Sequence, residues 1–153
     1  MKANQFVFGC LLIAGWVPTQ AAQFDDFAYE SSGTAVTITG YTGPGGAVTI
    51  PDNIQGLPVT SIGAQAFYGC TGLTNVVIPD SVTSIGEGAF SGCAGLRAFE
   101  VDELNPAFSS LEGVLFNESQ TVLMACPEGK IGSYTIPASV TSIGGMRSLA
   151  APA

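Results

Sequence analysis

The chain has 153 residues, the length of one domain, and 46% of them are hydrophobic while 10% are charged. Disordered chains show the opposite balance, so this composition predicts a folded protein. Twelve acidic residues against four basic ones give a net charge of −8, and histidine is absent. We therefore expect no nucleic-acid partner, and the commonest general base and metal ligand is missing.

The first 22 residues have the order of a secretory signal peptide. Lys2 gives a positive start, an apolar run extends from Phe6 to Val17, and small residues end the segment at Ala21 and Ala22. The apolar run is shorter than the roughly 20 residues that a helix needs to span a bilayer. A buried N-terminal helix is the structural alternative. The prediction is an exported protein, secreted or at the cell surface, without an integral membrane span.

Residues 23–47 are predicted to form an N-terminal β capping segment. Phe27–Glu30 and Thr34–Ile38 can pair around a turn at Ser31–Gly33 and cover the edge of the structure that follows. Gly43–Gly46 is rich in glycine but lacks the lysine and the spacing of a phosphate-binding loop, so a turn is expected there.

Residues 48–144 contain an internal repeat. The sequence VTSIG at 59–63 recurs at 82–86 and at 140–144, and residues 59–73 match residues 82–96 at 11 of 15 positions. The first step is 23 residues and the second is 58, so one unit is longer than the others. One such unit cannot bury its apolar face alone, so the pattern predicts a solenoid of stacked coils.

Each coil is predicted to hold a short β-strand followed by a turn or a short helix. Val76 and Ile78 alternate along one strand, which places both on the core side. Phe67 and Phe90 occupy the same position in successive units and are expected to stack.

The longer unit is predicted to carry a β-hairpin insert. Val114–Phe116 and Val122–Met124 are its expected arms and Asn117–Gln120 its turn. Phe108 and Phe116 are expected to be exposed on this insert and to offer a second contact surface.

Residues 78–96, IPDSVTSIGEGAFSGCAGL, resemble the BspA-type leucine-rich repeats of bacterial surface proteins. The resemblance runs from about Tyr41 to Gly144 and includes the longer unit at 105–137 and the opening segment at 35–63. It implies a curved solenoid without catalytic activity of its own, and a role in adhesion or in recognition of proteins and surfaces.

The repeat pattern stops in mid-unit after Gly144, so residues 145–153 are expected to be a non-repeat C-terminal tail. Solenoids normally have a polar capping repeat at each end. The alternative function is therefore a structural spacer, or a non-functional truncated fragment of a longer surface protein.

Three cysteines remain after removal of the predicted signal peptide. Cys70 and Cys93 occupy equivalent positions one unit apart and are expected to be neighbours, either bridged or as two free, buried thiols; the free form is favoured at this core position. Cys126 lies in the longer unit. The spacing of the cysteines does not match a zinc site.

Glu100, Asp102 and Glu103 form the densest group of carboxylates. A calcium site or an acid–base pair is conceivable there, but supporting partners are lacking and a solvated acidic patch is favoured. Asp52 and Asp80 follow a repeated Ile-Pro pair and are expected to accept hydrogen bonds from backbone N–H groups of the next turn. We predict no catalytic residue, no metal and no cofactor.

Outward-facing strand residues of such a solenoid form a concave recognition surface. The residues expected on it are Thr49, Asn75, Val77, Ala98, Glu100, Asp102, Ser133 and Thr135. The function predicted from the sequence is a non-enzymatic binding scaffold that contacts a protein or a glycan of unknown identity, as a monomer.

Overall fold

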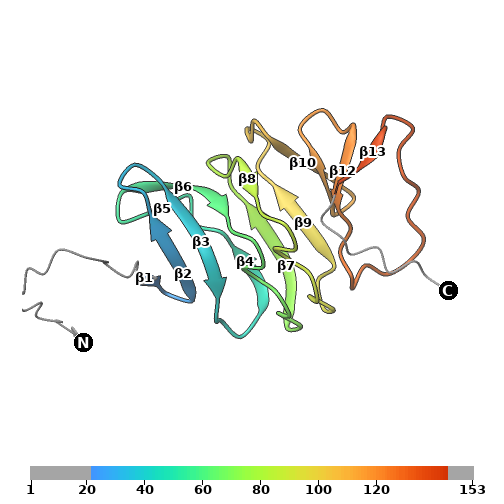
Figure 1. The fold of residues 1–153 in the computed structure, drawn as a ribbon. Coiled ribbons are helices and arrows are strands. Elements are labelled where there is room, and N and C mark those ends of the chain that lie inside the picture. Colours follow the sequence, from blue (N-terminus) through green and yellow to red (C-terminus); the bar gives the residue numbers. More distant parts are fainter. Residues whose placement is uncertain (1–21, 145–153) are drawn as a thin grey trace, which may run out of the picture.

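The computed structural model describes residues 22–144, which form a β-solenoid. Figure 1 shows short strands stacked side by side from the N-terminal to the C-terminal end of this segment. The predicted signal peptide, apart from Ala22, and the tail at 145–153 lie outside the described residues, and the domain boundaries remain predictions.

The first sheet contains the N-terminal strands. Its members are β1 (Ala22–Phe24), β2 (Phe27–Ser31), β3 (Val36–Tyr41), β5 (Asn53–Ile54), β6 (Leu57–Ile62) and β8 (Ser84–Ile85). β2 and β3 pair antiparallel, which confirms the predicted hairpin, although β3 begins and ends later than expected. β3, β6 and β8 are then parallel neighbours, with Ile62 beside Ile85, because the same sequence recurs 23 residues later.

The second sheet is parallel throughout. It consists of β4 (Gly46–Thr49), β7 (Leu73–Ile78) and β9 (Ala98–Val101), in that order. Val48, Val76 and Phe99 are aligned across the three strands, and all three side chains are buried. Val76 and Ile78 face the core as predicted.

The insert forms the third sheet, with the order β10 (Phe108–Leu111), β11 (Val114–Asn117), β12 (Val122–Ala125) and β13 (Ser142–Ile143). The predicted hairpin is present as β11 and β12, and β10 adds a strand that the sequence did not indicate. The third VTSIG segment stacks on β12: Thr141 donates to the Thr121 carbonyl and Gly144 to the Leu123 carbonyl. The insert therefore supplies one layer of the stack, which explains the 58-residue step.

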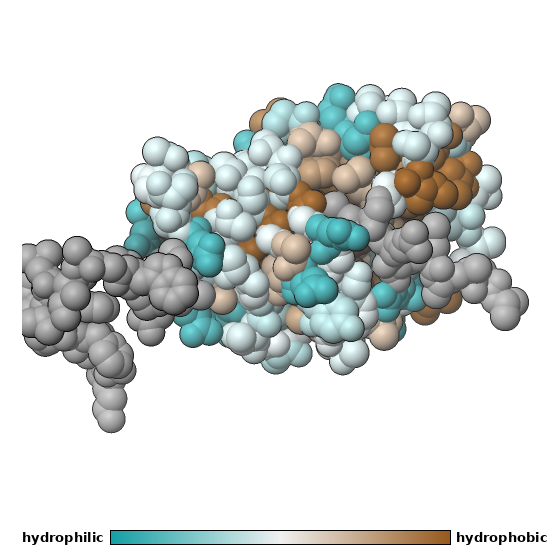
Figure 2. All heavy atoms as spheres, viewed as in Figure 1, coloured by the Kyte–Doolittle hydropathy of each residue, from teal (hydrophilic) through white to brown (hydrophobic). Residues whose placement is uncertain are grey.

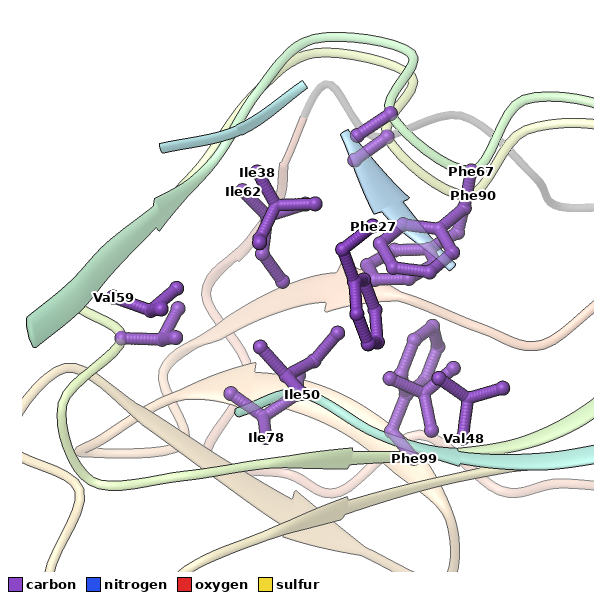
Figure 3. Packing of buried hydrophobic residues seen from close by; sticks show 14 of the residues in the cluster. Phe27, Ile38, Val48, Ile50, Val59, Ile62, Phe67, Ile78, Phe90 and Phe99 are labelled. Atoms are coloured by element: carbon purple, nitrogen blue, oxygen red, sulfur yellow. The ribbon is translucent and has the colours of Figure 1, made fainter. Parts of the chain in front are cut away.

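Repeated residues lie above one another in the core. Figure 3 shows Ile38 beside Ile62, Ile50 beside Ile78, and the rings of Phe67 and Phe90 overlapping. The centroids of those two rings are 5.0 Å apart and their planes meet at 22°, which confirms the predicted stack. Each fully buried phenylalanine contributes about 1.5–3 kcal/mol, so this row is a major source of stability.

The N-terminal hairpin covers the first coil through aromatic rings. Phe27 and Tyr41 both pack on Phe67, with centroids 6.4 Å and 5.2 Å from it. These rings cover Phe67 at the start of the stack, so the hairpin packs over that end of the core, and the assignment of residues 23–47 as a capping segment stays a prediction.

The expectation that Phe108 and Phe116 are exposed is wrong. Strand β10 directs Phe108 into the main core, where it is buried. Phe116 lies with Val114 and Leu123 in a second small core beneath the insert. The insert is therefore a packed layer, and it presents neither ring to a partner.

Turns connect the strands, and the described residues contain no helix. In the segment between β6 and β7, the Cys70 amide donates to the Phe67 carbonyl and the Leu73 amide donates to the Cys70 carbonyl. Each of these hydrogen bonds spans three residues. Gln65 has a φ of 58° and its repeat equivalent Gly88 has a φ of 64°, so this position requires the left-handed conformation. A backbone that alternates between right- and left-handed residues cannot continue as a helix.

Candidate functional site: the outer sheet face and its acidic groove

The outward side of the parallel sheet forms a continuous row of side chains. Thr49, Val77 and Glu100 are aligned across β4, β7 and β9, and Asn75 is aligned with Ala98 in the row before them. Their inward neighbours are buried, so alternation along each strand turns these side chains away from the core. We call these five residues the outer sheet face.

Two side chains of the outer sheet face hold each other in place. The Asn75 amide donates a 2.6 Å hydrogen bond to Glu100 Oε1 on the neighbouring strand. Thr49 and Glu100 are exposed, and Asn75, Val77 and Ala98 are partly buried. The face is therefore ordered and polar at its rim, with a small apolar centre at Val77.

The face is narrower than the sequence predicted. Ser133 and Thr135 are exposed, but they lie in a segment without a strand and do not extend the parallel sheet. At the far edge of β9 stands the turn of the β10–β11 hairpin, where the Gly113 carbonyl accepts a 2.9 Å hydrogen bond from the Phe99 amide. A Cβ at Gly113 would lie 2.8 Å from that of Ala98, so the insert presses closely on this edge.

An acidic groove of about 470 Å³ runs across the ends of β4, β7 and β9. Its lining includes Thr49, Val77 and Glu100 of the outer sheet face. Four of its lining residues are acidic, namely Asp52, Asp80, Glu100 and Asp102. The sequence analysis did not predict that the two Ile-Pro-Asp segments line this groove. Equal positions in successive coils stack, so the recurrence of this segment could have indicated it.

The turn-capping role expected for Asp52 and Asp80 is not observed. The Asp52 carboxylate accepts a bond from the side chain of Asn53, and within residues 22–144 that of Asp80 accepts none. Asp102 does cap a turn, by accepting a 2.9 Å bond from the Leu104 amide. Asp52 and Asp80 reach the groove because buried Ile50 and Ile78 hold the preceding strand ends, leaving their carboxylates exposed to solvent.

The turn-organising role belongs to Asn105, which the sequence did not single out. Its amide nitrogen donates to the carbonyls of Pro79 and Val82, at 2.7 and 2.9 Å. Its oxygen accepts from the amides of Ala107 and Phe108, at 2.9 and 2.8 Å. This buried side chain joins the end of one coil to the start of the insert.

Neither the carboxylates nor the thiols form a cluster suited to a metal. In the part of the chain that the structure describes, no three His, Cys, Asp or Glu residues are grouped so that they could hold an ion. Glu103 is exposed beside the groove and does not line it.

The thiols of Cys70, Cys93 and Cys126 are free. Cys93 is buried, and its thiol donates a 3.0 Å bond to the Phe67 carbonyl. Burial raises the pKa of the Cys93 thiol to about 11. A thiol that stays protonated is a poor nucleophile and a poor metal ligand, so Cys93 behaves as a core residue.

Stacked coils with a ladder of identical apolar residues and an open parallel sheet define a leucine-rich-repeat solenoid. The chain belongs to the BspA-type leucine-rich-repeat family: the model described as a BspA type leucine rich repeat region matches six copies over residues 47–146. A search of curated proteins found no match. Residues 22–144 contain no helix long and apolar enough to cross a membrane.

Solved structures of bacterial leucine-rich-repeat proteins resemble the chain. A leucine-rich-repeat protein of T. pallidum is 38% identical over 56% of this chain and 41% of its own, with a TM-score of 0.50. A leucine-rich cell surface protein of Faecalibacterium prausnitzii is 32% identical over 57% of this chain and 24% of its own, at 0.52. A Bacteroides ovatus protein, 24% identical, shares the fold over 82% of this chain and 32% of its own, at 0.55. The chain spans less than half the length of each of these proteins.

Proposed function

We propose that the chain is a non-enzymatic binding scaffold that contacts a protein or a glycan through the outer sheet face. The observation behind this proposal is the aligned row of Thr49, Val77 and Glu100, held on strands whose other side is anchored in the core. Side chains on such a rigid platform lose little freedom on binding, which favours recognition.

The chemistry of the face supports binding over catalysis. The carboxylates of the groove have no histidine to work with, since the chain contains none, and the outer sheet face carries no cysteine or serine nucleophile. The groove is acidic, so a partner with basic groups near its contact site fits it best.

The proposed location is the cell exterior, either secreted or at the surface. The signal-peptide pattern of residues 1–22 supports it, as does the similarity to a protein described as a leucine-rich cell surface protein. Fusion of residues 1–22 to a reporter that is active only after export tests the location. Reporter activity is expected, and a reporter that stays inactive inside the cell would contradict it.

Immobilised extracellular-matrix proteins and bacterial cell-wall glycans provide the probes for the binding function. Residues 22–153 are expected to bind at least one probe, with an affinity that falls as salt is raised because the groove is charged. Retention on a matrix protein indicates a protein partner, and retention on a glycan indicates a glycan partner. Absence of binding to every probe by a folded chain would contradict the proposal.

A second candidate function, a structural spacer, is favoured by the small size of the residues on the outer sheet face. The face has no tryptophan, tyrosine or arginine, the residues that dominate strong contact sites. A spacer would melt cooperatively and yet bind none of the probes.

A further inference from the structure

The C-terminal end of the stack exposes an apolar surface that the interior coils bury. Its residues are Ile131, Ile136 and Ile143, which we call the terminal coil face; Tyr134 and Val140 of the same coil are partly buried against the second small core. The three isoleucines are 81%, 44% and 54% exposed, respectively. Figure 2 shows strongly hydrophobic residues gathered at this end of the molecule, over the segment coloured red in Figure 1.

The same repeat positions are covered elsewhere in the chain. Leu73 and Leu96 correspond to Ile131, Ile78 to Ile136, and Ile62 to Ile143, and these four side chains are at most 1% exposed. The remaining equivalents, Val101 and Ile85, are partly buried. In each case another layer of the stack lies on top of the coil. The terminal coil face therefore consists of residues at positions that stacking buries in other coils. Among the described residues, no further layer covers it.

The backbone of the terminal coil also offers unpaired groups. Strand β13 pairs with β12 on one side and is the last strand of its sheet among residues 22–144. An edge strand presents N–H and C=O groups that can pair with another strand. The opposite end of the solenoid is closed, because the β2–β3 hairpin packs on the first coil.

Charge restricts where two copies of this chain can meet. Residues 22–126 contain eleven acidic residues against one basic residue, Arg97, a net charge of −10. Residues 127–144 contain one of each, Glu128 and Lys130, and are neutral. The net charge of residues 22–126 therefore opposes contact between two copies through that part, and contact at the terminal coil keeps their acidic bodies farthest apart.

We propose that the terminal coil face is a self-association surface, at which two copies meet about a two-fold axis. The isoleucines of each copy cover those of the other, and the β13 edges lie beside each other. A two-fold contact needs only one self-complementary patch and closes at two subunits, which suits a chain whose other end is capped. This dimer takes the place of the monomer expected from the sequence, and it does not rest on the proposed function.

The dimer has a consequence for recognition. It carries two outer sheet faces on one particle, so a surface with many copies of a partner is bound through both faces at once. Two linked contacts bind far more tightly than one, which compensates for a face without strong anchors.

Light scattering after size-exclusion chromatography of residues 22–153, over a range of protein concentrations, measures the mass. The wild-type chain is expected to give twice the mass of one chain at the higher concentrations. Ile131→Asp and Ile143→Asp place a charge in the interface and are expected to give a monomer with an unchanged thermal melt. Leu104→Asp is the matched control: Leu104 is 79% exposed but lies outside the terminal coil, so this variant should remain a dimer.

Hydrogen exchange at the Ser142 and Ile143 amides provides a second measurement, which needs no substitution. Protection that rises with protein concentration supports the dimer. A wild-type monomer at every concentration would overturn the proposal, whether or not these amides are protected. Oligomers that keep growing, or a dimer that survives both Asp substitutions, would overturn it as well.

Discussion

Asn105 offers the sharpest test of how the coils are held together. Asn105→Ala removes the four hydrogen bonds that this side chain makes to the backbone of two neighbouring segments. It leaves the Val82 carbonyl and two amides without their partners, while the Pro79 carbonyl keeps its bond from the Val82 amide, in a region where Asn105 itself is 4% exposed. A buried polar group that loses its partner costs about 1–3 kcal/mol, and water can enter part of the vacated space. We therefore expect the free energy of unfolding to fall by roughly 3–5 kcal/mol, because each group that loses its partner contributes near the lower end of the range of about 1–3 kcal/mol.

Urea unfolding followed by far-UV circular dichroism measures this loss as a shift of the midpoint. Asn53→Ala is the matched control, because the exposed Asn53 side chain bonds only the neighbouring Asp52 carboxylate; its effect is expected to stay within about 0.5 kcal/mol. If Asn105→Ala costs no more than this control, the four bonds do not organise the junction and our reading of it is wrong.

Three further predictions concern the core and the turns. Gln65→Gly relieves a left-handed backbone position that the next coil fills with Gly88, and it is expected to raise the free energy of unfolding by about 1 kcal/mol in urea; a decrease would show that the Gln65 side chain matters more than its backbone. Phe90→Ala opens the aromatic stack and is expected to cost about 3–5 kcal/mol, whereas Tyr68→Ala, at an exposed ring, should cost less than about 0.5; equal losses would contradict the stacked core. The folded-state pKa of Cys93 is raised from 9.0 to about 11 by burial, so its contribution to stability is complete below pH 9 and is lost as the pH rises through about 11. Replacement of Cys93 by Ala should flatten this pH dependence, and an unchanged profile between pH 9 and 11 would exclude the thiol as its source.

The sequence predicted most of the solenoid because the repeat fixes its own packing. Once VTSIG recurs after 23 residues, equal positions must lie above one another, and the stack of Phe67 on Phe90 follows without further information. The N-terminal hairpin was also predictable, from a turn between two alternating segments.

Features without a repeat partner were the ones that sequence reasoning missed. Strand β10 occurs once in the chain, so no second copy showed that Phe108 turns inward to the core. Asn105 also occurs once, and its four bonds depend on carbonyls that lie more than twenty residues away and on amides of the irregular turn itself. Such contacts are set by tertiary packing, which local pattern does not reveal.

The candidate site was predicted in part for the same reason. The row of Thr49, Val77 and Glu100 follows from strand alternation and repeat register. Ser133 and Thr135 were assigned to that row by the same logic, but the turn of the insert stands beside β9 and the parallel sheet ends there. Which partner the face binds depends on chemistry outside the chain.

Contact between the outer sheet face and the partner can be tested by placing one bulky charge at two different positions on the molecular surface. Val77→Arg places it in the middle of the face, and Tyr68→Arg places it on an exposed turn elsewhere. Binding of residues 22–153 to the matrix-protein and cell-wall-glycan probes is then compared by surface plasmon resonance, after both variants are shown to melt like the wild type. If the partner contacts the outer sheet face, Val77→Arg abolishes binding and Tyr68→Arg retains it; equal binding by both variants would exclude such a contact.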